Sequence, residues 1–169
     1  MPSETQTDTA RSTLSSYLND HLAGSKGAVQ LVEKIRKENE GSPLGALMGR
    51  LGAEIEADRD TLQALMLRLG VEPSRAKQAA GWTAEKLSRV RFAGTLTGSD
   101  ATSRLMQLEA LCLGVEGKRS LWKALQQLPE SAFGPESVDF DRLIARAGAQ
   151  RDAVEPFRLQ SAGEAFASA

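Results

Sequence analysis

The sequence predicts an all-α fold: a four-helix up-down bundle of two antiparallel hairpins, joined by a long crossover that carries a short helix. Helix-forming residues such as Ala, Leu, Arg, Glu and Gln are frequent, while aromatic residues make up only 5% of the chain. Apolar residues recur at heptad-like spacing in four long stretches. A chain of 169 residues is also large enough to bury a core of its own.

Two of these stretches predict the first hairpin. The first helix should begin near residue 12 or 13, where a hydroxyl can cap it, and end near Lys37. The second should begin at Pro43, which suits a first turn, and end near Leu69, before Gly70. The inward stripe of the first helix is Leu14, Leu18, His21, Ser25, Ala28, Val32 and Ile35. That of the second is Leu44, Met48, Leu51, Ile55, Asp58, Leu62, Leu65 and Leu69.

The short polar turn between these helices requires them to be antiparallel. Residues at equal distances from the centre of the turn should therefore lie at the same level. With the turn centred between residues 39 and 40, Gly27 faces Gly52 and His21 lies level with Asp58. The stripes thus predict a polar layer near the middle of an otherwise apolar core.

The second half of the chain predicts a crossover followed by another hairpin. Residues 70–100 are rich in helix breakers and should form the crossover, with a short amphipathic helix over residues 83–92. Long helices should follow over residues 101–128 and 139–166, and Pro156 should kink or split the last one. Their inward positions are Leu105, Leu108, Leu111, Val115, Trp122, Leu125, Leu143, Ala147, Val154 and Phe157.

Residues 1–11 are polar and predict a mobile N-terminal tail, so residues 12–169 should form a single bundle domain.

Lys and Arg total 21 against 22 Asp and Glu, which argues against electrostatic binding of nucleic acid or an anionic membrane. No stretch approaches the roughly 20 apolar residues of a membrane span. The single cysteine, Cys112, excludes an internal disulfide and is best explained as a packed core residue. We therefore expect a cytoplasmic protein.

The order of helix, short turn, helix, long crossover, helix, loop and helix resembles the ferritin-like superfamily over about residues 12–167. Members with a di-iron site carry a Glu on two helices and a Glu-x-x-His motif on the other two. This sequence has no Glu-x-x-His: Glu54 precedes Ala57 by three residues, and Glu109 precedes Cys112 likewise. The resemblance therefore implies the fold, in a diverged member without the di-iron motifs.

The polar layer has two interpretations at His21 and Asp58. In the first, they bind iron, manganese or zinc together with carboxylates of other helices. The candidate ligands are then His21, Glu54, Asp58, Glu109 and Glu116. In the second, a hydrogen bond between His21 and Asp58 fixes the register of the helices. The second is favoured because the chain contains one histidine only.

Charged residues on the last two helices predict ion pairs. Glu109 and Glu116 share a helix face, as do Arg151 and Arg158, and both pairs have the same spacing. Across the loop, Glu116 should lie level with Arg151 and Glu109 with Arg158. An arginine that points into a layer of carboxylates would repel a metal ion, so ion pairs are favoured over metal binding.

These patterns predict a non-catalytic binding or assembly protein, acting as a homodimer, with no catalytic residue and no cofactor. The alternative is a carboxylate-rich metal-binding protein or oxidoreductase with an atypical one-histidine site. A third interpretation makes the polar layer a pocket for a small molecule, walled by Trp82, Trp122 or Tyr17.

Overall fold

The computed structural model describes residues 4–74 and 100–167 of the chain. Within these ranges four long helices pack against one another and no strand occurs, which confirms the all-α prediction. They are α1 (Glu4–Glu38), α2 (Pro43–Arg68), α5 (Ala101–Leu125) and α6 (Phe140–Phe166), with a short 3₁₀ helix, η1 (Glu130–Phe133), before α6. None of these helices has the length and apolar character needed to cross a membrane. The short helix predicted over residues 83–92 lies outside the described residues.

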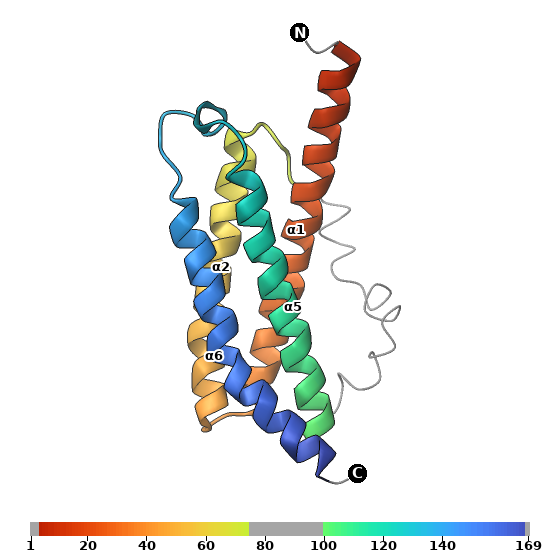
Figure 1. Cartoon of the computed structure of the whole chain (residues 1–169), viewed down its shortest axis with the longest axis vertical. Helices are drawn as coiled ribbons and strands as arrows, with labels where there is room; N and C mark the ends of the chain where they lie inside the picture. Colours follow the sequence, from red (N-terminus) through yellow and green to blue (C-terminus); the bar gives the residue numbers. More distant parts are fainter. Residues whose placement is uncertain (1–3, 75–99, 168–169) are drawn as a thin grey trace.

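The four helices form two antiparallel hairpins, α1 with α2 and α5 with α6 (Figure 1). The most extensive helix contacts lie within the hairpins, while the contacts of α1 with α5 and of α2 with α6 are smaller. Helices α2 and α5 run in the same direction. The chain leaves α2 at one end of the bundle and enters α5 at the other end (Figure 1).

Local capping explains why α2, α5 and α6 begin close to where the sequence predicts. Ser42 Oγ accepts a hydrogen bond from the backbone N–H of Gly45 at 3.1 Å, one turn into α2. Asp100 and Asp139 cap α5 and α6 in the same way, through Ser103 and Arg142. After α2, Gly70 adopts a φ of +66°, a left-handed conformation in which glycine carries no Cβ penalty.

Helix α1 begins earlier than predicted. It already includes Glu4, so residues 4–11 are helical where the sequence suggested a tail. Residues 8–13 are exposed, and this part of the helix therefore carries no apolar stripe that could reveal it. The Thr13 hydroxyl donates to the carbonyl of Thr9 at 2.9 Å, inside the helix, instead of capping its start. Helix α5, in contrast, ends at Leu125 and not at Leu128.

Two apolar clusters fill the bundle, one toward each end. The first joins α1, α2, α5, η1 and the start of α6 around Leu22, Met66, Trp122 and Phe133. The second joins the four helices around Ile35, Met48, Leu108 and Val154. All predicted inward apolar positions of α2 and α5 are buried except Leu69, which is half-buried. The predicted stripes of these two helices are thereby confirmed.

The register between α1 and α2 differs from the prediction. A Cβ atom placed on Gly52 would lie 3.4 Å from Val32 Cγ1, so Gly52 faces Val32 and not Gly27. The turn occupies residues 39–42, and its centre therefore lies later in the chain than the sequence suggested.

Pro156 lies inside α6 and does not split it. In Figure 1 the last part of α6 inclines toward the beginning of α5. Pro156 is exposed and lacks the N–H that an interior helical position donates.

We expect Pro156→Ala to raise the free energy of unfolding by about 1–3 kcal/mol in urea titrations. An exposed substitution on α5, Ser120→Ala, should change it by less than about 0.5 kcal/mol. Equal or lower stability of Pro156→Ala would contradict this account.

Candidate functional site

A buried carboxylate occupies the layer between the two apolar clusters. Asp58 of α2 is only 2% exposed. Its Oδ2 accepts a hydrogen bond from Lys118 Nζ of α5 at 2.5 Å, and its Oδ1 pairs with the guanidinium of Arg146 of α6. An isolated carboxylate is expensive to bury, and these two cations compensate its charge within the protein.

Gln150 of α6 completes this polar layer from a buried position. Its Nε2 donates to Glu54 Oε2 at 2.9 Å and to Asp58 Oδ2 at 3.3 Å, while its Oε1 accepts from Lys118 Nζ at 2.5 Å. Burial lowers the pKa of Lys118, and the neighbouring charge of Asp58 opposes that shift. We call Asp58, Lys118, Arg146 and Gln150 the Asp58 network.

His21 is not part of the Asp58 network. The predicted hydrogen bond between His21 and Asp58 is wrong, because the two carboxylate oxygens of Asp58 are bonded to side chains of α5 and α6. The imidazole of His21 instead meets the ring of Tyr17 edge to face, with 4.6 Å between ring centroids. Burial lowers the pKa of His21 below its ordinary 6.5, and Asp20 partly opposes the shift.

One of the two predicted ion pairs between α5 and α6 is confirmed. Arg158 Nη1 lies 3.2 Å from Glu109 Oε1. The pair between Glu116 and Arg151 is wrong: the structure pairs Glu116 with Arg119 on its own helix and Arg151 with the adjacent Asp152. These two contacts, at 3.6 Å and 3.4 Å, are exposed and contribute little to stability.

The five candidate metal ligands do not converge. Asp58 is bonded to two cations, Glu54 to Gln150, and Glu109 to Arg158. Within residues 4–74 and 100–167, no group of three or more His, Cys, Asp or Glu side chains is arranged to hold a metal ion. Lys118 and Arg146 would moreover repel a cation at the place where Asp58 could bind one.

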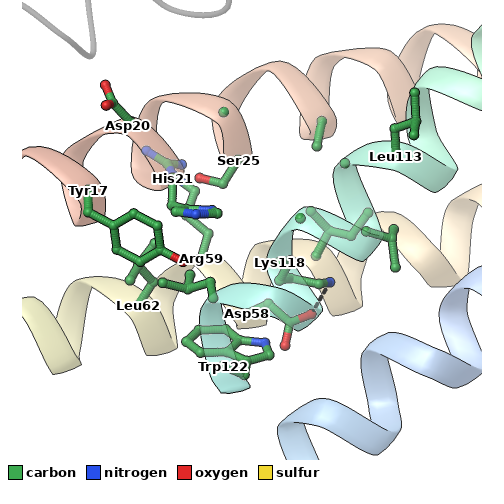
Figure 2. Close-up of a pocket in the computed structure, with 17 residues that line it drawn as sticks. Tyr17, Asp20, His21, Ser25, Asp58, Arg59, Leu62, Leu113, Lys118 and Trp122 are labelled. Carbon is green, nitrogen blue, oxygen red and sulfur yellow. Dashed lines mark hydrogen bonds and ion pairs between the residues drawn. The ribbon is translucent and has the colours of Figure 1, made fainter. Parts of the chain in front are cut away.

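A cavity of about 470 Å³ lies beside the Asp58 network, between α1, α2 and α5 (Figure 2). It exists because the facing positions are small: Gly24 and Ala28 on α1, and Gly114 and Gly117 on α5. A Cβ atom on Gly114 or Gly117 would meet no other atom within 4 Å, apart from its own helix turn. The seam between α1 and α5 is therefore left open.

Aromatic and polar side chains line this cavity. Tyr17 and Trp122 form part of its wall, as the third interpretation of the sequence predicted, whereas Trp82 lies outside the described residues. Trp122 is 1% exposed, and its indole Nε1 has no hydrogen-bond partner among the residues that the structure describes. Arg59, also in the lining, has a buried Nε without a partner. His21 and Asp58 both face the cavity without touching each other.

The partners of Asp58 were not predicted from the sequence. A signal existed for two of them, because Lys118 and Gln150 stand at inward positions of the apolar stripes of α5 and α6. Each interrupts its stripe with a polar side chain, as Asp58 does on α2. Arg146 and Arg59 stand next to inward positions, and no periodicity marks them.

Removing the carboxylate of the Asp58 network should destabilise the protein strongly. Asp58→Ala leaves Lys118 and Arg146 without an anion, and we expect a loss of about 2–4 kcal/mol in the free energy of unfolding. The expected loss stays moderate because both cations still reach solvent. Glu116→Ala, which removes an exposed carboxylate, should cost less than about 1 kcal/mol in the same urea titration. Equal effects of the two substitutions would contradict the role given to Asp58.

The burial of His21 predicts its titration. Since the folded protein holds the pKa of His21 below 6.5, the unfolded chain binds the extra proton first as the pH falls. Stability should therefore decrease between pH 7 and pH 5, and less so in His21→Gln. The single histidine of the chain should also titrate below about 6.5 in proton NMR spectra. A value at or above 6.5 would show that the ring is solvated.

Comparison of the chain with protein-family models, with curated proteins and with solved structures found no significant match. The site itself combines a buried carboxylate that is bonded to two cations with a neighbouring cavity. This cavity has aromatic walls, and two of its lining residues, Trp122 and Arg59, have a buried N–H without a partner among the described residues.

Proposed function

We propose that this protein is a non-catalytic helical binding protein that holds a small organic molecule in the cavity between α1, α2 and α5. The cavity itself carries the proposal. Its volume of about 470 Å³ falls within the range of ligand pockets, roughly 300–1,000 Å³. Its lining combines apolar side chains such as Leu62, Val115 and Leu121 with a few polar groups, the combination that is typical of small-molecule sites.

The walls favour an aromatic or branched apolar body. Tyr17 and Trp122 present ring surfaces to the cavity, and Ile55 and Leu62 add aliphatic surface from α2. Trp122 also supplies a hydrogen-bond donor that no described residue uses. A buried donor without a partner costs free energy, and an acceptor on a bound molecule would recover it.

The chemistry of the site favours binding over catalysis. Both carboxylate oxygens of Asp58 are already bonded to cations of the protein. Burial raises the pKa of the Cys112 thiol, with Glu155 adding to the shift, which weakens it as a nucleophile. Among the described residues, His21 makes a ring contact with Tyr17 and no hydrogen bond to a carboxylate that would orient it as a base.

We also propose that the chain is a diverged ferritin-like protein. The support is the arrangement of its helices: two antiparallel hairpins in which α2 and α5 run in the same direction (Figure 1). The polar layer stands where a bundle of this kind can hold a metal, but here its carboxylate is bonded to Lys118 and Arg146.

Filling the cavity should abolish binding without harming the fold. Gly114→Leu places a side chain into open space at the cavity wall and also replaces a helical glycine, which favours the helix by about 1 kcal/mol. We expect the purified protein to bind the neutral fluorescent probe N-phenyl-1-naphthylamine, and Gly114→Leu to weaken this binding by at least about tenfold.

The matched control is Gly148→Leu on α6. A Cβ at Gly148 likewise meets no atom within 4 Å, and Gly148 does not line the cavity. Probe binding to Gly148→Leu should equal that of the unaltered protein in fluorescence titrations. No binding by the unaltered protein, or equal loss in both variants, would overturn the proposed function.

A further inference from the structure

We propose that the ligand of this cavity is a small amphipathic anion, whose carboxylate, phosphate or sulfonate group pairs with Arg59 while its apolar body contacts the aromatic wall. This inference rests on the proposed function, and it specifies the chemical class that the same cavity takes. The observation behind it is a cation in the cavity lining that has no partner among the described residues.

Within residues 4–74 and 100–167, Arg59 is the cation of the cavity lining whose charge is left uncompensated. It lies on α2 immediately after Asp58 and is half-buried. No ion pair or hydrogen bond of its side chain is found among the residues that the structure describes, and its Nε is buried without a partner. A buried N–H group without an acceptor is unfavourable, and a planar oxyanion can accept two N–H groups of one guanidinium at once.

The other charges around the cavity do not offset Arg59. Asp58 is compensated by Lys118 and Arg146, so that this carboxylate has no remaining charge to share with its neighbour in sequence. Asp20 is exposed at the rim, and in Figure 2 its carboxylate points away from the cavity. Asp58, Lys118 and Arg146 together keep a net positive charge, which adds to the positive charge of Arg59 and favours an anion over a cation.

The remaining lining indicates where the rest of the molecule would lie. Arg59 stands on the same side of the cavity as Tyr17 and Leu62 (Figure 2), and Trp122 closes the wall from α5. An anion with a flat or branched apolar body would thus pair with Arg59 at one end and exclude water from these side chains at the other. The indole N–H of Trp122 has no partner among the described residues, and the side chain of Trp122 belongs to the wall of the same cavity.

Two fluorescent probes with a nearly identical body separate the charge from the apolar contact: 8-anilinonaphthalene-1-sulfonate, an anion, and N-phenyl-1-naphthylamine, which is neutral. Both are titrated into the folded full-length protein, into Arg59→Gln and into Arg50→Gln. Arg50 is an exposed arginine on the same helix that does not line the cavity, so this control matches the change in charge. Unfolding titrations of all three proteins ensure that only folded variants are compared.

We expect Arg59→Gln to weaken binding of the sulfonate by about tenfold or more and to change binding of the neutral probe by less than about twofold. Arg50→Gln should change neither. Two results would overturn the assignment of an anionic ligand while the cavity remains a binding site for the neutral probe. In the first, Arg59→Gln weakens binding of both probes equally or of neither. In the second, Arg50→Gln weakens binding of the sulfonate as much as Arg59→Gln does. If neither probe binds the unaltered protein, the proposed function fails and this inference fails with it.

Discussion

The buried carboxylate of Asp58 connects three of the four helices, and much of the molecule follows from how its charge is satisfied. A carboxylate in an apolar interior requires cations within hydrogen-bond distance. Lys118 of α5 and Arg146 of α6 supply them, and Gln150 links the two hairpins further. The contact between α2 and α6 is otherwise small, so these polar contacts contribute much of the specificity with which the hairpins dock. They also divide the core into two apolar clusters, one toward each end of the bundle.

The same arrangement decides what the centre of the bundle can bind. Because Asp58 is compensated by the protein's own cations, the layer offers no surplus of negative charge to a metal ion. Helix α1 takes no part in the Asp58 network, and its small residues face the glycines of α5. The space that this leaves has aromatic walls, and of the cations in its lining Arg59 alone has no acidic partner among the described residues. The polar layer and the cavity thus both result from the same packing of α1 and α2 against α5 and α6.

Particular residues show how far sequence reasoning reached. The stripes of α2 and α5 were predicted correctly because each repeats an apolar residue every three or four positions, and the capping residues Ser42, Asp100 and Asp139 mark helix starts through local hydrogen bonds. The ion pair of Glu109 with Arg158 followed from helix spacing. The predicted pairing of His21 with Asp58 is wrong because Asp58 is bonded to Lys118 and Arg146, partners on other helices that spacing within the first hairpin does not reveal. The predicted start of α1 was too late because the exposed first turns of this helix carry no apolar pattern.

By itself, the sequence determined the helical class, most of the helix boundaries and the presence of polar residues at inward positions. These properties depend on local hydrogen bonds and on the 3.6-residue period, which act over a few neighbouring residues. Only the tertiary structure decided that Asp58 meets Lys118 and Arg146, that His21 meets Tyr17, and that the seam between α1 and α5 encloses a cavity beside Arg59. Such pairings depend on the relative displacement and rotation of whole helices, and a shift of a single turn exchanges every partner across an interface.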